Sequence, residues 1–191
     1  MGRMRGVVER PGGLRYDEEV LDPAEEQRLV GQIERLDFHE VSMRGQVARR
    51  TVRHFGFEYG YESWQLVPGD PLPAYLVPLR DRCAALAGLD PSALAQTLVT
   101  RYPAGSSIGW HRDAPVFGPV VAGVSLLSSC LLRFQRGTGK AREVFEQPLA
   151  PRSGYVLAGA ARSSWQHSIP PVADLRYSVT FRTLRAPRST G

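Results

Sequence analysis

The chain has 191 residues, of which 42% are hydrophobic and 23% are charged. This length suits one domain with its own core, and the composition is that of a globular protein rather than a disordered or fibrous one. No apolar run approaches the ~18 residues of a membrane span, and the first residues lack the apolar segment of a secretion signal. We therefore expect a single domain over residues 1–191, a cytoplasmic location and no membrane partner. The sequence does not give the oligomeric state, and we expect a monomer.

The formal net charge is +5, which favours a polyanionic partner such as nucleic acid. The preference is weak, because Lys140 is the only lysine and an excess of arginine also follows from codon composition. Cys83 and Cys130 lack the spacing of a metal-binding pair, so we expect both thiols to be reduced and buried.

Two helices are predicted in the N-terminal half. Asp22 and Pro23, followed by two glutamates, form a helix start, and an apolar stripe continues to about residue 36. A second helix is predicted over residues 74–87, with Pro78 delaying or kinking its first turn and Gly88 ending it.

Beyond residue 90 the apolar pattern takes the period of strands. Segments rich in Val, Leu, Phe, Tyr and Thr, separated by Gly, Pro and Ser, cover residues 95–102, 120–127, 130–136, 143–149, 153–159 and 176–184. Many short strands without intervening helices indicate an α+β, mainly β fold, a sandwich or jelly roll whose two N-terminal helices cover one outer face. Residues 185–191 are expected to form a loose tail.

The segment over residues 49–61 combines three arginines with alternating aromatic residues. On a single strand, Phe55, Phe57, Tyr59 and Tyr61 would share one face, just downstream of Arg50. Aromatic rings stack on bases and arginines bind phosphates, so one interpretation is a nucleotide-binding lid. The other is a hairpin whose aromatic face packs on the core.

Two histidines and an aspartate are the most informative residues. His111 and Asp113 are two positions apart, so on a strand they point to the same side, and His167 follows later in the chain. Two imidazoles and one carboxylate form the facial triad that binds non-heme Fe(II) and leaves positions open for a co-substrate and O2. Trp110 and Trp165 flank these ligands and are expected to be pocket walls, with core packing as the alternative.

A second pattern lies in residues 176–182, where polar and apolar residues alternate. A strand would present Arg176, Ser178 and Arg182 on one face, and an arginine fork matches a carboxylate, so the pair suits a small diacid such as 2-oxoglutarate. Zinc would fit the same metal ligands but gives no reason for paired arginines, so iron is favoured. In the alternative, both arginines face solvent. His39 and His54 lack such a context and are expected to be surface or structural residues.

Residues 95–184 resemble the AlkB family of Fe(II)- and 2-oxoglutarate-dependent dioxygenases. The family pattern is Asn-x-Tyr, a glycine-containing turn, His-x-Asp, a distal His and Arg-x5-Arg in the last strand. The matching residues here are Thr100-Arg101-Tyr102, Pro103-Ala104-Gly105, His111-Arg112-Asp113, His167, Arg176 and Arg182.

The resemblance implies a double-stranded β-helix, which is a jelly roll, with the oxygenase core over residues 95–184 and the helices and substrate lid over residues 14–94. It implies Fe(II), 2-oxoglutarate and O2 as cofactors, with His111, Asp113 and His167 as iron ligands. The implied reaction is oxidative dealkylation, such as demethylation, of N-alkylated bases in DNA or RNA, as in DNA repair. Decarboxylation of 2-oxoglutarate to succinate and CO2 accompanies it.

For the co-substrate, the resemblance implies that Arg176 binds the distal carboxylate, assisted by the Tyr102 hydroxyl. Arg182 would lie at the end that chelates the metal. Thr100 stands where the family usually has Asn, and with Ser178 it is expected beside the co-substrate.

Pro115 stands two residues after Asp113, where base-repair members carry an acidic residue that reads the flipped base. The residues 49–61 are similar to the region before the core in relatives that act on wobble uridine of transfer RNA. Two alternatives stay open: hydroxylation or demethylation of a protein side chain, modified transfer RNA or small molecule, and an RNA-binding module without catalysis.

Overall fold

The computed structural model describes residues 8–43, 46–60 and 66–185. The predictions for Tyr61 and for most of the C-terminal tail lie outside these residues. None of the helices in the described ranges is long and apolar enough to cross a membrane.

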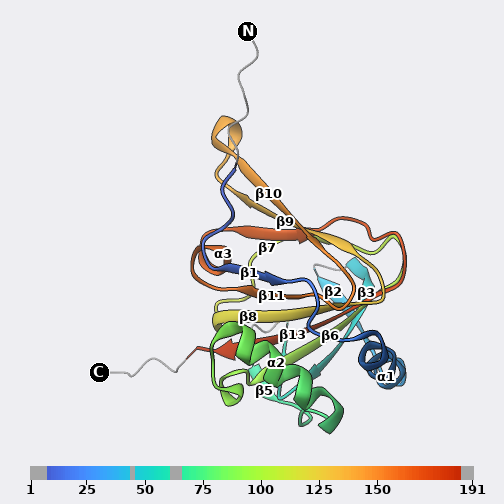
Figure 1. Ribbon diagram of the computed structural model, residues 1–191. Helices are drawn as coiled ribbons and strands as arrows, with labels where there is room; N and C mark the ends of the chain where they lie inside the picture. The colour runs from blue at the N-terminus through green and yellow to red at the C-terminus, as the bar shows by residue number, and fades with distance from the viewer. Residues whose placement is uncertain (1–7, 44–45, 61–65, 186–191) are drawn as a thin grey trace.

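Thirteen strands and three α-helices are present in the described part of the chain (Figure 1). The helices are α1 (Pro23–Ile33), α2 (Val77–Ala87) and α3 (Gly159–Ser163). The strands are β1 (Leu14–Asp17), β2 (His39–Met43), β3 (Gln46–Phe55), β4 (Phe57–Tyr59), β5 (Leu66–Pro68), β6 (Gln96–Tyr102), β7 (Ile108–His111), β8 (Phe117–Leu126), β9 (Cys130–Arg136), β10 (Glu143–Leu149), β11 (Gly154–Leu157), β12 (Gln166–Ile169) and β13 (Arg176–Leu184).

The strands form two main antiparallel sheets. The major sheet has the order β1-β11-β8-β13-β6-β3-β2 and the minor sheet has the order β10-β9-β12-β7. A small third sheet pairs β4 with β5. In Figure 1 the minor sheet lies on one side of the major sheet, and α1 and α2 lie on the other. The predicted jelly roll with helices on one outer face is therefore confirmed.

The helix starts follow the local chemistry of the sequence. The Asp22 side chain accepts a hydrogen bond from the Glu25 amide, and the Glu25 side chain accepts one from the Asp22 amide, which closes a capping box. Helix α1 ends at Ile33, about one turn before its predicted end. Pro78 delays α2, which begins at Val77 after a 3₁₀ turn.

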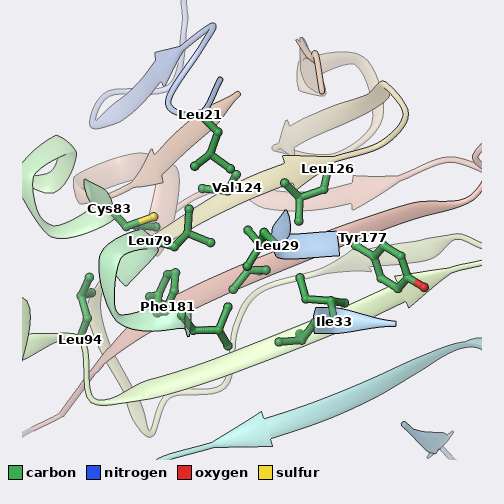
Figure 2. Close-up of a cluster of buried hydrophobic side chains, with 14 of the residues drawn as sticks. Leu21, Leu29, Ile33, Leu79, Cys83, Leu94, Val124, Leu126, Tyr177 and Phe181 are labelled. Carbon is green, nitrogen blue, oxygen red and sulfur yellow. The ribbon is translucent and has the colours of Figure 1, made fainter. Parts of the chain in front are cut away.

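A large apolar cluster joins α1 and α2 to the major sheet (Figure 2). Leu29 and Ile33 come from α1, Leu79 and Cys83 from α2, and Phe181 from β13. A second apolar cluster, which includes Tyr102, Phe134 and Trp165, lies between the two sheets. The cysteine prediction holds for the buried Cys83, whereas the Cys130 thiol is free but only half-buried.

The predicted continuous strand over residues 49–61 is wrong, because the chain bends at Gly56. Gly56 has a φ of +76°, and a Cβ atom there would lie 2.2 Å from the Ala95 carbonyl oxygen. Only glycine fits this position. The bend sends Phe55 into the helix-side cluster and leaves Tyr59 to pack against Phe117, with ring centroids 5.5 Å apart. The aromatic residues therefore do not share one face.

Candidate metal and co-substrate site

A cavity of about 510 Å³ lies between the two sheets. Strands β3, β6, β7, β12 and β13 all contribute side chains to its wall. The predicted site residues that line it are Arg50, Tyr59, Thr100, Tyr102, Trp110, His111, Asp113, His167 and Arg182. The strand order of the two sheets thus brings residues from distant parts of the sequence to one cavity.

His111 and His167 face each other across neighbouring strands. They are direct partners in the β7–β12 register, and their ring centroids are 4.2 Å apart. The Nδ1 atom of His111 is 2.8 Å from the Gly109 carbonyl oxygen, to which it donates, so Nε2 carries the lone pair. Burial lowers the pKa of both imidazoles, that of His167 to about 3, so both rings are neutral, as metal ligands must be.

Asp113 lies two residues beyond the end of β7, rather than on the strand as predicted. Its Oδ2 atom is 3.7 Å from His167 Nε2, and its Oδ1 atom accepts from Arg182 Nε at 3.0 Å and from Arg182 Nη2 at 2.9 Å. Burial alone would raise the pKa of this carboxyl, but Arg182, His167 and His111 outweigh it and hold the pKa well below its usual range. The aspartate is therefore ionised at neutral pH.

These three side chains fit a divalent metal in chemistry and in approximate position. Two ligands ~2.1 Å from one metal are ~3 Å apart at a right angle, and the His167–Asp113 separation is somewhat longer. Among the described residues, no group of three or more His, Cys, Asp or Glu side chains could hold a metal ion as the side chains stand. Two N–H groups of Arg182 hold Oδ1 of the Asp113 carboxylate, and its Oδ2 lies on the side of His167.

Arg176 is the strongest indication of a bound carboxylate. Its side chain is fully buried, its Nε donates to Ser125 Oγ at 2.9 Å, and its guanidinium lies 5.1 Å from the centroid of the Tyr102 ring. Its Nη1 and Nη2 atoms are buried without a hydrogen-bond partner. A buried charge with two unused donors is costly unless an anion binds there, and a carboxylate matches this fork. The alternative of solvent-facing arginines is therefore wrong.

The other co-substrate predictions are met in part. Thr100 is buried and lines the cavity, so a hydroxyl occupies the position of the family's amide. Ser178 is buried and lies between Thr100 and Ser125 in the sheet register, but it is not among the cavity-lining residues. The strand face predicted from alternation is correct, but of Arg176, Ser178 and Arg182 only Arg182 is among the residues that line the cavity, whereas Arg176 and Ser178 are buried.

The predicted substrate residues divide into two groups. Arg50, Tyr59 and Trp110 line the cavity, whereas Phe57 does not. Trp165 is also not in the wall: it is 1% exposed and belongs to the apolar cluster between the sheets. The pocket-wall interpretation of Trp165 is therefore wrong, because its ring faces the core.

Two cavity-side residues were missed in the sequence. His54, expected to be a surface or structural residue, lines the cavity, whereas His39 is exposed as predicted. Gln96 is fully buried and accepts a hydrogen bond from Arg182 Nη1 at 3.0 Å. A polar residue at an inward position of the apolar strand β6 was the available signal for Gln96.

Comparison with known proteins decides the family. The model described as "2OG-Fe(II) oxygenase superfamily" matches residues 18–184, which is most of the chain. The chain belongs to this superfamily. Membership of this superfamily confirms the predicted cofactors, Fe(II) and 2-oxoglutarate, which react with O2.

Within the superfamily, the AlkB assignment is confirmed by similar curated proteins. The "Alkylated DNA repair protein ALKBH8 homolog" of Arabidopsis thaliana is 28% identical over 170 residues, covering 77% of this chain and 47% of that protein. The "Probable RNA/DNA demethylase ALKBH6" of Danio rerio is 26% identical over 152 residues, covering 80% and 62% respectively. The oxygenase chain thus spans half or less of the length of the first relatives, and about three fifths of the zebrafish protein.

Solved structures show the same fold at low identity. The structure of OsALKBH1 superposes with a TM-score of 0.70 at 14% identity, covering 92% of this chain and 98% of that chain. A Pseudomonas putida prolyl-4-hydroxylase superposes with a TM-score of 0.64 at 13% identity, covering 91% and 93% respectively. Both support the jelly roll of this oxygenase.

Proposed function

We propose that the protein catalyses oxidative dealkylation of N-alkylated bases in DNA or RNA, coupled to conversion of 2-oxoglutarate to succinate and CO2. The observation that carries this proposal is the buried Arg176 fork, with two unused donors, on the same strand face as the arginine that holds Asp113. When bound, Fe(II) with 2-oxoglutarate supplies the O2 activation that hydroxylates an alkyl carbon on nitrogen. The hydroxylated group then leaves as an aldehyde.

The roles of the metal ligands follow from protonation and orientation. His111 and His167 would bind the metal through neutral imidazole nitrogens, and Asp113 would bind it as a carboxylate. The bonds from Arg182 fix the rotamer of Asp113 and compensate for its buried charge. This chain thus holds its donors in the charge state that metal binding requires.

The co-substrate would extend from the metal toward Arg176. The two free Nη donors of Arg176 would bind the distal carboxylate in bidentate fashion, and the Tyr102 ring below the guanidinium fixes its plane. Thr100 lines the cavity and can donate one hydrogen bond to the co-substrate.

Support for a nucleic-acid substrate comes from the rim of the cavity. Trp110 lines the cavity, and the guanidinium carbons of Arg133 and Arg142 lie 5.0 and 5.7 Å from the centroid of its ring. Arg50 and Tyr59 add a further cation and a further ring to the wall. Stacking rings beside cations suit a polynucleotide whose altered base enters the cavity. The names of the plant and zebrafish relatives, which mention alkylated DNA and RNA/DNA demethylation, agree with this class.

The decisive experiment is succinate release from 2-oxoglutarate by the purified protein with added Fe(II), with and without methylated oligonucleotides. We expect turnover in the wild type and a loss of more than about 100-fold in Asp113→Ala and Arg176→Ala, with formaldehyde only when oligonucleotide is present. Succinate without any oligonucleotide effect would reject the nucleic-acid substrate and keep the oxygenase. No succinate under any condition would reject both.

A second enzymatic candidate is hydroxylation of a protein side chain, a modified transfer RNA or a small molecule. It is favoured by the fold match to a prolyl-4-hydroxylase and by Pro115, which offers no polar group for reading a base. The RNA-binding module without catalysis predicts oligonucleotide binding together with zero turnover, and binding that His111→Ala leaves unchanged.

Three further properties remain our proposals on sequence grounds. We propose that the protein acts as a monomer, in the cytoplasm, and as a single domain over residues 1–191. A role in DNA repair, rather than RNA demethylation, would follow if alkylated DNA proves to be the better oligonucleotide in the succinate assay.

A further inference from the structure

Gln96 is a buried amide at the start of β6 that contacts two other strands of the site. Its Oε1 atom accepts a hydrogen bond from Arg182 Nη1 at 3.0 Å. Its Nε2 atom is 3.2 Å from His54 Nδ1, 3.1 Å from the Thr97 carbonyl oxygen and 3.5 Å from the Phe57 carbonyl oxygen. One side chain thus connects β13 with β3 and with the first residue of β4.

The orientation of this amide is fixed from both ends. Arg182 can only donate, so the amide oxygen must face it, and carbonyl oxygens can only accept, so the NH2 group must face Phe57 and Thr97. With the NH2 group on that side, His54 Nδ1 must accept and its proton sits on Nε2. No apolar residue satisfies these groups, and their burial makes each lost bond costly.

We propose that Gln96 is a positioning residue for the metal site. It holds Arg182 in the orientation that presents the Asp113 carboxylate to the metal, and it ties this arrangement to the cavity wall formed by β3 and β4. The inference rests on the proposed metal site, because Asp113 must be a ligand for its orientation to matter. Three hydrogen bonds make this connection: Gln96 Nε2 donates to His54 Nδ1, Arg182 Nη1 donates to Gln96 Oε1, and Arg182 Nε donates to Asp113 Oδ1.

The second half of the inference concerns the bend at Gly56. The Gly56 Cα packs against the Ala95 carbonyl, next to Gln96, and the Gln96 amide then binds the following carbonyl, that of Phe57. The wall that carries His54 and Tyr59 is therefore anchored to the same side chain that anchors Arg182. Contact of a substrate with this wall would reach Asp113 through three hydrogen bonds in series, wall to Gln96, Gln96 to Arg182 and Arg182 to Asp113.

The test compares Gln96→Met, Gln96→Glu and the control Thr97→Val, with Mn(II) alone as the metal probe. Methionine matches glutamine in length without its polar atoms. Glutamate, ionised beside a guanidinium, keeps an oxygen for Arg182 but loses the donor for Phe57. Thr97 is equally buried, one residue away and on the opposite, helix-facing side of β6. Calorimetry measures Mn(II) affinity, and hydrogen exchange measures protection of residues 54–59.

We expect Gln96→Met to weaken Mn(II) binding by about 10-fold, the lower end of the effect for partners of metal ligands. Gln96→Glu should restore affinity to within about threefold of the wild type, while both variants increase hydrogen exchange over residues 54–59. Thr97→Val should leave both readouts unchanged. Wild-type Mn(II) affinity in a folded Gln96→Met with a lower melting temperature would overturn the proposal, since that result describes a purely structural residue.

These measurements separate this inference from the proposed function. They require no turnover, so a protein that releases no succinate but shows the expected Mn(II) pattern keeps the positioning role and loses the oxygenase proposal. If His111→Ala binds Mn(II) as well as the wild type does, the metal site itself is wrong. The role of Gln96 would then fall with it, whatever the succinate assay shows.

Discussion

The two faces of β13 are equally buried and opposite in chemistry. Tyr177, Val179 and Phe181 point into the apolar cluster beneath the helices, whereas Arg176 and Arg182 point between the sheets. On the helix side, burial of apolar surface stabilises the fold directly. On the cavity side, burial of two cations costs free energy unless each is paired. The comparison shows that apolar burial on one face of β13 offsets the free-energy cost of the two buried arginines on the other face, where a ligand can bind.

The two cations differ in how far the chain itself satisfies them. Arg182 donates to Asp113 and to Gln96, so its charge is compensated within the protein. Arg176 donates only through Nε, to Ser125, and its two Nη atoms have no partner. The chain therefore compensates the charge of Arg182 by itself and leaves two buried donors of Arg176 for a bound anion.

The largest effect is expected on the helix-facing side. Phe181→Ala removes a fully buried ring from the main cluster and should lower the free energy of unfolding by about 3–5 kcal/mol. Urea denaturation measures this loss. The folded fraction should bind 2-oxoglutarate as the wild type does, and a weakened affinity there would show that the two faces are not separable.

Arg176→Met should show the reverse pattern. Methionine has a similar length but no charge, so the substitution removes an incompletely paired buried cation. The free energy of unfolding of the ligand-free protein should therefore stay unchanged or rise by about 1–4 kcal/mol. Affinity for 2-oxoglutarate in the presence of Mn(II) should fall by more than about 100-fold, because two charge-assisted bonds are lost at ~1.5–3 kcal/mol each. Calorimetry measures the affinity. A large drop in ligand-free stability would mean that Arg176 serves the fold.

Sequence patterns predicted the residues whose positions follow from local periodicity. Alternation along β13 placed Arg176 and Arg182 on one face, and the spacing of His111 and Asp113 brought both to one cavity. The capping residues predicted the start of α1 at Pro23 correctly. For β13 and α1 the geometry repeats within one element, so a few neighbouring residues determine it, whereas Asp113 lies just past the end of β7 and reaches the cavity from the loop.

Other features depend on contacts between distant segments. Gln96 meets Arg182 across 86 positions and His54 across 42, which no local pattern encodes. The bend at Gly56 has a positive φ and lies against the Ala95 carbonyl, where only glycine fits, and it interrupts an alternation that otherwise predicts one strand. Trp165 lies two residues before His167, a predicted iron ligand, yet the turn before β12 directs its ring into the core.

The pH dependence of stability tests a buried group on the cavity side, His54. Burial, with Arg182, His39 and Arg53 nearby, lowers its pKa from 6.5 to about 4. The unfolded chain therefore takes up a proton near pH 6.5 that the folded protein takes up only near pH 4, so stability falls as the pH drops through this window. We expect protonation of His54 to lower the free energy of unfolding by about 2 kcal/mol over this window, a value already reduced for the partial exposure of the ring.

His54→Gln cannot titrate and should remove that contribution, so the variant loses about 2 kcal/mol less than the wild type between pH 7 and pH 4.5. The buried His111 and His167 titrate in both proteins and cancel in the comparison. Parallel stability curves for the two proteins would show that His54 is not held neutral in the fold.

The smallest effect concerns a polar residue on the helix side, Glu26 of α1. Its Oε1 accepts from the Leu127 amide at 2.8 Å and its Oε2 lies 3.4 Å from Arg152 Nη1, so the chain itself satisfies this buried carboxylate. Glu26→Gln keeps an acceptor for Leu127 and loses the charge facing Arg152, which should cost about 1 kcal/mol without changing 2-oxoglutarate affinity. Glu19→Gln, an exposed partner of the same arginine, is the matched control and should cost less than about 0.5 kcal/mol. Equal losses of stability in both variants would mean that burial does not strengthen the Glu26–Arg152 pair. Glu26 would then not be an example of a buried charge that the chain itself stabilises, in contrast to Arg176, whose two Nη atoms have no partner in the chain.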